Sequence, residues 1–139
     1  MNDPQLSALL RLSKTAAAAS RHLDADLGGH HGLGFAELRL LRALAAAPQR
    51  RLRPTDLAGE LEVTPSGVTR AVLPLEKRGI VRRERDPGDA RSTRIVLTPA
   101  GRTLVADAST TARESAAKLM RRLSLGQTRQ LERLLGEIE

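Results

Sequence analysis

The chain has 139 residues and a net charge of +7, is 40% apolar, and has Phe35 as its single aromatic residue. This length suits one domain, residues 1–139, with a core of Leu, Ala, Val and Ile in closely packed helices. The absence of cysteine excludes disulfides, thiolate metal sites and thiol redox chemistry. No apolar run has the length of a membrane span or a signal-peptide core, so we expect a soluble, cytoplasmic protein.

The first 48 residues predict two amphipathic helices. Apolar residues at spacings of three, four and seven favour one long helix over residues 5–27, which Gly28 and Gly29 would end. A second helix is predicted from Phe35 to Ala46, with Pro48 closing it.

Two shorter helices with a tight turn are predicted next. Pro54 suits the first position of a helix, and Glu62-Val63 forms the turn after it. Thr64-Pro65 predicts the next helix start, because the threonine oxygen accepts an unpaired amide hydrogen and proline has no amide hydrogen to leave unpaired. This helix reaches Arg78, and Gly79 stops it. The pattern is a helix-turn-helix.

A β-hairpin is predicted to follow. Residues 80–85 and 93–98 are rich in β-branched side chains, and the polar segment 86–89 between them contains Pro and Gly. This hairpin, the wing, completes a winged helix-turn-helix.

The C-terminal part of the chain predicts two more helices. Thr98-Pro99 repeats the start pattern for a helix that runs to about Leu123, and Ser124 with Gln127 has capping-box spacing for the last helix. The last helix has an apolar stripe that needs a cover, either a second copy of the chain or its own first helix. The stripe consists of Leu131, Leu134, Leu135 and Ile138.

Positive charge concentrates in the winged segment, where residues 50–102 hold 12 Arg and Lys against 7 Asp and Glu. A basic surface beside a recognition helix supplies phosphate binding, which positions a protein on DNA without reading sequence. The alternative interpretation is that the arginine-rich composition only solvates the surface.

Short polar side chains and an arginine near a helix N-terminus are typical of base recognition. The candidate DNA-binding residues of the recognition helix are Thr64, Pro65, Ser66, Thr69 and Arg70. Arg70 suits a bidentate contact with guanine. The competing interpretation is an ordinary solvated helix face.

In the wing, the candidates are Asp89, Arg91 and Arg94. Asp89 and Arg91 are two residues apart, so we expect the carboxylate to hold the guanidinium as it enters a minor groove. Arg94 is expected to neutralise a phosphate. A solvated hairpin tip is the competing interpretation.

The ordered string of motifs resembles the MarR (multiple antibiotic resistance regulator) family. It comprises Leu57-Ala58, Val63-Thr64-Pro65-Ser66, Val68-Thr69-Arg70, Leu75 to Arg83, Asp86 to Arg91 and Leu97-Thr98-Pro99-Ala100-Gly101.

The resemblance implies a mainly α fold with a small β-hairpin wing. The DNA-binding lobe would span residues 35–102, and residues 5–27 and 103–138 would form the dimerisation helices of a homodimer. The recognition helix would enter the major groove and the wing the adjacent minor groove. A small aromatic or anionic effector would bind at the junction of the two parts, where His30, His31 and Phe35 lie.

Two residues depart from the family pattern. Gly88 stands where the wing usually has an arginine, so we expect a looser tip. Pro74 falls inside the recognition helix, and we expect a kink at residues 70–74 because proline lacks an amide hydrogen and clashes with the preceding turn.

Other classes of site are weaker. His22, Asp24, Asp26, His30 and His31 fall within ten residues and would suit Zn or Mn. However, His22 and Asp26 are one helical turn apart, whereas His30 and His31 follow two glycines in an expected loop. We therefore expect neither a metal nor a cofactor. The sequence contains neither a nucleophile paired with a base nor a phosphate-binding glycine loop, so we do not expect an enzyme.

The sequence thus predicts a sequence-specific regulator, a homodimeric repressor of a pseudo-palindromic double-stranded DNA operator that a small ligand relieves. The alternatives are a nonspecific architectural DNA-binding protein and a protein-interaction module that has lost DNA binding.

Overall fold

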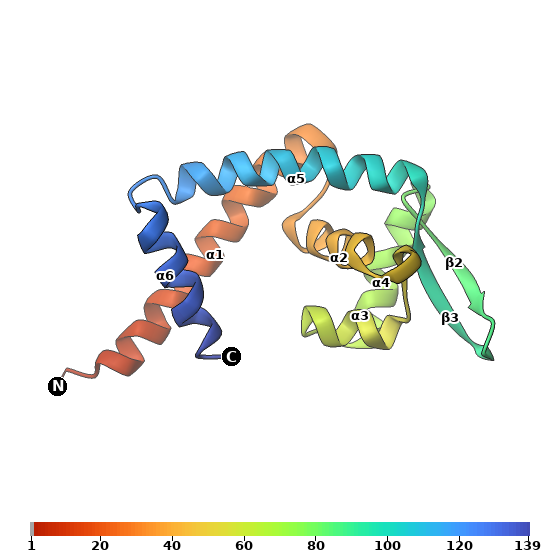
Figure 1. Cartoon of the computed structure of the whole chain (residues 1–139), viewed down its shortest axis with the longest axis horizontal. Helices are drawn as coiled ribbons and strands as arrows, with labels where there is room; N and C mark the ends of the chain where they lie inside the picture. Colours follow the sequence, from red (N-terminus) through yellow and green to blue (C-terminus); the bar gives the residue numbers. More distant parts are fainter. Residues whose placement is uncertain (1) are drawn as a thin grey trace.

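The computed structural model describes residues 2–139 and is mainly helical, with a small antiparallel sheet (Figure 1). Its elements are α1 (Pro4–His31), α2 (Phe35–Ala46), a 3-10 turn η1 (Pro48–Arg50), β1 (Arg51–Leu52), α3 (Pro54–Leu61), α4 (Pro65–Lys77), β2 (Val81–Asp86), β3 (Asp89–Leu97), α5 (Pro99–Leu119) and α6 (Leu125–Gly136). The predicted winged helix-turn-helix with flanking helices is confirmed. None of the helices formed by residues 2–139 has both the length and the apolar character needed to cross a membrane.

Helix α5 connects two parts of the molecule (Figure 1). At its N-terminal end lie α2, α3, α4 and the hairpin, which we call the lobe. At its C-terminal end the chain turns into α6, and α1 packs along α5 itself. We call α1, α5 and α6 the platform.

Four helices begin with a side-chain oxygen of the N-cap residue accepting the amide hydrogen of the residue three positions later. The pairs are Asp3 with Leu6, Thr64 with Gly67, Thr98 with Gly101 and Ser124 with Gln127, at N···O distances of 3.0–3.2 Å. The starts at Thr64, Thr98 and Ser124 are those that the sequence predicts. Each cap satisfies an amide that the first helical turn leaves without a partner.

The predicted end of α1 at Gly28 and Gly29 is wrong. The helix continues to His31 and ends at Gly32, whose φ of 65° lies in the left-handed region. Glycine costs a helix only about 1 kcal/mol per residue, and tertiary bonds hold this last turn. His31 Nε2 lies 2.7 Å from Thr111 Oγ1 of α5, and Arg78 donates hydrogen bonds to the carbonyls of His31 and Gly32.

The sheet has the strand order β1-β3-β2, and all its pairs are antiparallel. The predicted hairpin is confirmed, although β3 begins at Asp89 and not at Thr93. The sequence did not predict β1, whose two residues pair with Ile95 and Val96 at the base of the wing. The wing is therefore attached to the segment just before the helix-turn-helix.

The lobe is built on a leucine-rich core beneath α4. Val68, Val72 and Leu75 of α4 are buried, as are Leu57 and Ala58 of α3. They pack into one cluster with leucines of α1 and α2 and with the inner residues of the sheet. Both short helices thus turn these residues inward, and the opposite face of α4 is left in solvent.

The start of α5 is pressed against the turn after α4. A Cβ atom on Gly101 would overlap the backbone oxygen of Ile80 and lie 2.6 Å from Leu97 Cδ1. Because backbone atoms cannot rotate away, only glycine fits at this position of the helix.

We predict that Gly101→Ala lowers the free energy of unfolding by about 1–3 kcal/mol, the usual cost of overpacking. Thermal or denaturant unfolding measures the effect. The matched control is Gly59→Ala in α3, where an added Cβ meets no atom within 4 Å. That variant should be neutral or stabilising by up to about 1 kcal/mol. Equal stability of Gly101→Ala and the wild type would contradict the close packing.

Candidate nucleic-acid interface

The outer face of α4 presents a polar stripe at its N-terminal end. Thr64, Ser66, Thr69 and Arg70 are exposed, and Arg70 takes part in none of the ion pairs found within residues 2–139. The Thr64 and Ser66 hydroxyls lie 3.2 Å apart, and Thr69 Oγ1 donates to the carbonyl of Pro65. Arg70 therefore has an uncommitted guanidinium beside the positive end of the helix dipole, where anions are favoured.

Pro74 does not interrupt α4. The helix is continuous from Pro65 to Lys77, so the kink expected at residues 70–74 does not break it. Pro74 is exposed, one turn after Arg70 on the same face, and Leu73 beside it is 41% exposed. With its ring directed to solvent, the proline removes the hydrogen bond to the Arg70 carbonyl without disturbing the buried side of the helix.

The wing is stiffened at its turn by Asp86, which sequence reasoning did not select as a site residue. The Asp86 carboxylate accepts the Gly88 amide at 2.9 Å and Arg53 Nε at 2.8 Å. The Gly88 hydrogen bond, followed by the Arg53 charge, lowers the pKa of Asp86 against the opposing effect of its burial. The looser tip expected from Gly88 thus has an internal restraint, and an Asp before Pro-Gly was the available signal.

A second carboxylate, Glu84, pairs with three arginines at the middle of the wing. Arg51 of β1, Arg82 and Arg94 all form ion pairs with it, the last two at 2.9 and 3.1 Å. Burial acts to raise the pKa of Glu84, but the Arg82 hydrogen bond and the three positive charges together lower it. Arg94 is held inside the wing, so a contact with phosphate would compete with Glu84.

Arg91 is the exposed arginine at the tip of the wing. The expected pairing of its guanidinium with Asp89 is absent from the ion pairs of residues 2–139. Instead, Asp89 Oδ1 accepts the backbone amide of Arg91 at 3.0 Å. This local turn fixes the backbone at residue 91. Because the Asp89 carboxylate bonds to the Arg91 amide and not to its guanidinium, the Arg91 side chain is free to extend into solvent.

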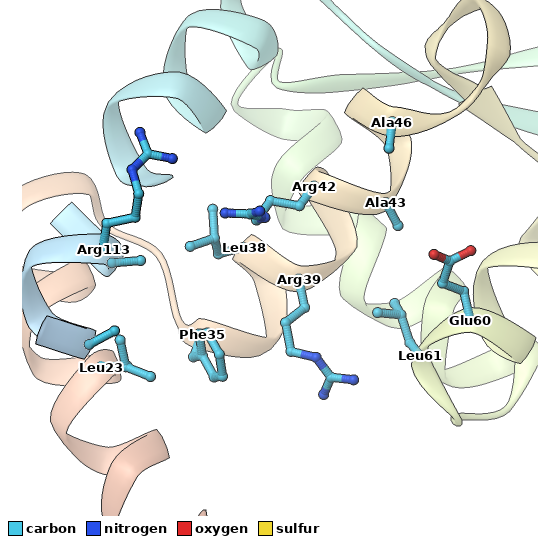
Figure 2. A pocket seen from close by; sticks show the side chains of 12 residues that line it. Leu23, Phe35, Leu38, Arg39, Arg42, Ala43, Ala46, Glu60, Leu61 and Arg113 are labelled. Atoms are coloured by element: carbon cyan, nitrogen blue, oxygen red, sulfur yellow. The ribbon is translucent and has the colours of Figure 1, made fainter. Parts of the chain in front are cut away.

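An open pocket of about 580 Å3 lies between the platform and the lobe (Figure 2). Its apolar wall includes Leu23, Phe35, Leu38 and Leu61, and its basic side chains are Arg39, Arg42 and Arg113. Of the three residues predicted to meet an effector, only Phe35 lines it. His31 is bonded to Thr111, and His30 is exposed outside the pocket.

The acidic and histidine residues of α1 do not gather into a metal site. His22 Nε2 lies 3.6 Å from Asp26 Oδ2, whereas Asp24 Oδ1 accepts the amide of Phe35 at 2.7 Å. Within residues 2–139 no three His, Cys, Asp or Glu side chains converge as metal ligands. Asp24 instead supplies a cap for α2, which the sequence did not indicate.

Known proteins match this fold and this sequence. The model of the MarR family matches residues 31–92. The HTH-type transcriptional repressor Rv2887 of Mycobacterium tuberculosis is 32% identical over 107 residues, which are 77% of this chain and 76% of that relative.

Two solved structures extend the likeness to the whole chain. The first is Sco3205, a MarR family transcriptional regulator from Streptomyces coelicolor in complex with DNA, with 29% identity, a TM-score of 0.89, and coverage of 99% of this chain and 88% of that one. The second is the transcriptional regulator BldR from Sulfolobus solfataricus, with 26% identity, a TM-score of 0.89, and coverage of 99% and 97%. The chain therefore belongs to the MarR family of transcriptional regulators, as the motifs of residues 57–101 indicate.

Proposed function

We propose that the protein is a sequence-specific repressor that binds a pseudo-palindromic DNA operator as a homodimer. The observation that carries this proposal is the exposed stripe of Thr64, Ser66, Thr69 and Arg70 at the N-terminus of α4, with Arg91 free at the wing tip. A helix N-terminus with short polar side chains and a free arginine suits the major groove. Relatives named as repressors, and Sco3205 in complex with DNA, support it.

The geometry argues against a nonspecific architectural protein. Such a protein needs only positive charge, yet Arg51, Arg53 and Arg94 are already paired with carboxylates of the lobe. Competition with bulk genomic DNA separates the two functions. A specificity ratio above about 10³ supports the repressor, and a lower ratio supports the architectural protein. Failure to bind any DNA supports an interaction module.

We predict that Arg70→Ala lowers the affinity for the operator by about 1–3 kcal/mol and relaxes its base preference, because one bidentate base contact is lost. Arg91→Ala should weaken binding through the wing. The operator is first selected from random duplexes, and titration at fixed salt gives both affinities. Arg121→Ala, an exposed arginine between α5 and α6, is the control. Unchanged affinity in both test variants would refute the assigned contacts.

The platform supports the homodimer through its exposed apolar side chains. Helix α6 buries none of its residues, and Leu134 and Ile138 are 48% and 62% exposed. Leu6, Leu9 and Leu10 on the first turns of α1 are exposed as well. Apolar surface in two neighbouring arms of one chain is stabilised when a second copy covers it.

We predict that Leu134→Asp converts a dimer into a monomer while the lobe stays folded. Burying the new carboxylate in the interface would cost more free energy than burial of the remaining apolar surface contributes. Sedimentation or light scattering measures the mass, and circular dichroism measures the fold. Arg129→Asp, exposed on the side of α6 opposite the stripe, should stay dimeric. A monomeric wild type, or a Leu134→Asp variant that remains a dimer, would contradict the proposed interface.

The pocket between platform and lobe supports relief by a small effector with an apolar body and a negative charge. Apolar side chains on one side and three arginines around them suit a carboxylate attached to a ring. Because the walls of the pocket come from both the platform and the lobe, such a ligand would alter the position of the lobe relative to the platform.

We predict that benzoate raises the melting temperature of the DNA-free protein and releases it from the operator. Benzyl alcohol, of similar shape without the charge, should do neither at the same concentration. Arg113→Ala should weaken both effects of benzoate, because it removes one positive charge from the wall. A benzoate response that Arg113→Ala leaves intact would exclude this pocket.

A further inference from the structure

Arg78 is rigidly attached to the end of the recognition helix. It is the C-cap of α4, and its amide donates to the carbonyl of Pro74. The chain then turns through Gly79, with φ of 74°, and the Ile80 amide returns to the Leu75 carbonyl at 3.0 Å. Because these bonds close the helix end, the Arg78 Cα moves with α4 as one body.

The Arg78 side chain reaches from the lobe to the platform. Nη1 donates to the Gly32 carbonyl at 2.9 Å, and Nη2 donates to the His31 carbonyl at 3.1 Å. These oxygens lie at the C-terminus of α1, where the helix dipole is negative and carbonyls lack partners. A guanidinium is a planar fork, so gripping two successive carbonyls sets direction as well as distance.

The end of α4 is fastened to the platform at a second place. Thr98, the N-cap of α5, has its hydroxyl 2.6 Å from the Gly79 carbonyl and 2.9 Å from that of Ile80. Apart from Arg78, α1 and α4 share little packing. The lobe also meets the platform where α2 packs against α5 and α1, and the fork of Arg78 adds a directional restraint on α4 itself.

We propose that Arg78 is a positioning residue that fixes the angle of the recognition helix against the platform. In the dimer this angle sets the separation of the two recognition helices. This inference rests on the DNA-binding homodimer proposed above. Arg78 thereby contributes to operator affinity without contacting a base, since both terminal nitrogens are directed at α1.

A spin-label distance tests the positioning directly. The chain has no cysteine, so Gly59→Cys in α3 places one label on each lobe of a dimer, at a site where a Cβ meets no atom within 4 Å. Arg78→Ala should broaden or shift the inter-label distance distribution without DNA. Lys77→Ala, which removes the adjacent exposed charge, should leave it unchanged. An unchanged distribution for Arg78→Ala would overturn the proposal.

DNA binding distinguishes positioning from a phosphate contact. Arg78→Ala should lose roughly 3- to 30-fold of operator affinity, the range of mutations that alter coupling at a distance. Its affinity for random DNA, and the salt dependence of that affinity, should equal those of the wild type. An equal loss on both DNAs, with a salt slope reduced by about 1, would make Arg78 a phosphate contact and overturn the proposal.

Two further arms keep the outcome decisive. Arg78→Lys serves if Arg78→Ala unfolds, because it keeps the charge with one nitrogen in place of the fork; a distance distribution identical to the wild type would then overturn the proposal. If wild-type protein gives no inter-label distance, the dimer proposal fails. A second label at Ser13→Cys on α1 then measures the lobe against the platform within one chain, and broadening by Arg78→Ala still supports the positioning role.

Discussion

The arrangement of the lobe depends on one junction, where the Thr98 hydroxyl meets the turn after α4. That oxygen accepts the Gly101 amide to begin α5 and lies within hydrogen-bonding distance of the Gly79 and Ile80 carbonyls that end α4. The recognition helix, both wing strands and the platform therefore meet around one side chain. Only glycine fits at residue 101 because the two backbones approach so closely. Hydrogen bonds weaken steeply away from their preferred distance and angle, so this junction constrains orientation as well as position.

Within this frame, the carboxylates of the lobe decide which arginines are already paired. Glu84 engages Arg94, Asp86 engages Arg53, and a further ion pair joins Glu76 of α4 to Arg83 of β2. The Arg83 hydrogen bond lowers the pKa of Glu76. The positive charge counted in the sequence therefore overstates what the surface offers to DNA. Arg70 on α4 and Arg91 at the wing tip are among the exposed arginines that the ion pairs of residues 2–139 leave unengaged.

Local chemistry explains why the helix starts were predictable. Thr64-Pro65, Thr98-Pro99 and the Ser124–Gln127 box each satisfy amides within three or four residues, so the pattern is complete in the sequence itself. The end of α1 was not predictable in this way. Its last turn depends on Thr111 and Arg78, which are distant in the chain and only adjacent after folding.

The same distinction applies to the candidate site. The exposed face of α4 follows from helical periodicity, because burial of Val68, Val72 and Leu75 forces the intervening side chains outward. The ion pair of Arg53 with Asp86 joins residues 33 positions apart, and no local pattern encodes such a partner. The residues of the pocket between the platform and the lobe were predicted only in part for the same reason. Phe35 lines the pocket, but the continuation of α1 turns His31 toward α5.

The short loop between α1 and α2 contacts both the pocket and the end of the recognition helix. Gly32 provides an acceptor for Arg78, and Phe35, three residues later, forms part of the pocket wall. Asp24 ties the Phe35 amide back to α1 at 2.7 Å, so this short segment has little freedom of its own. In the proposed effector response, an occupant that displaces Phe35 would act on the Asp24 cap or on the Arg78 hydrogen bond to Gly32. Through Arg78, the second route would change the angle of the recognition helix, which is the angle that the proposed positioning role of Arg78 fixes.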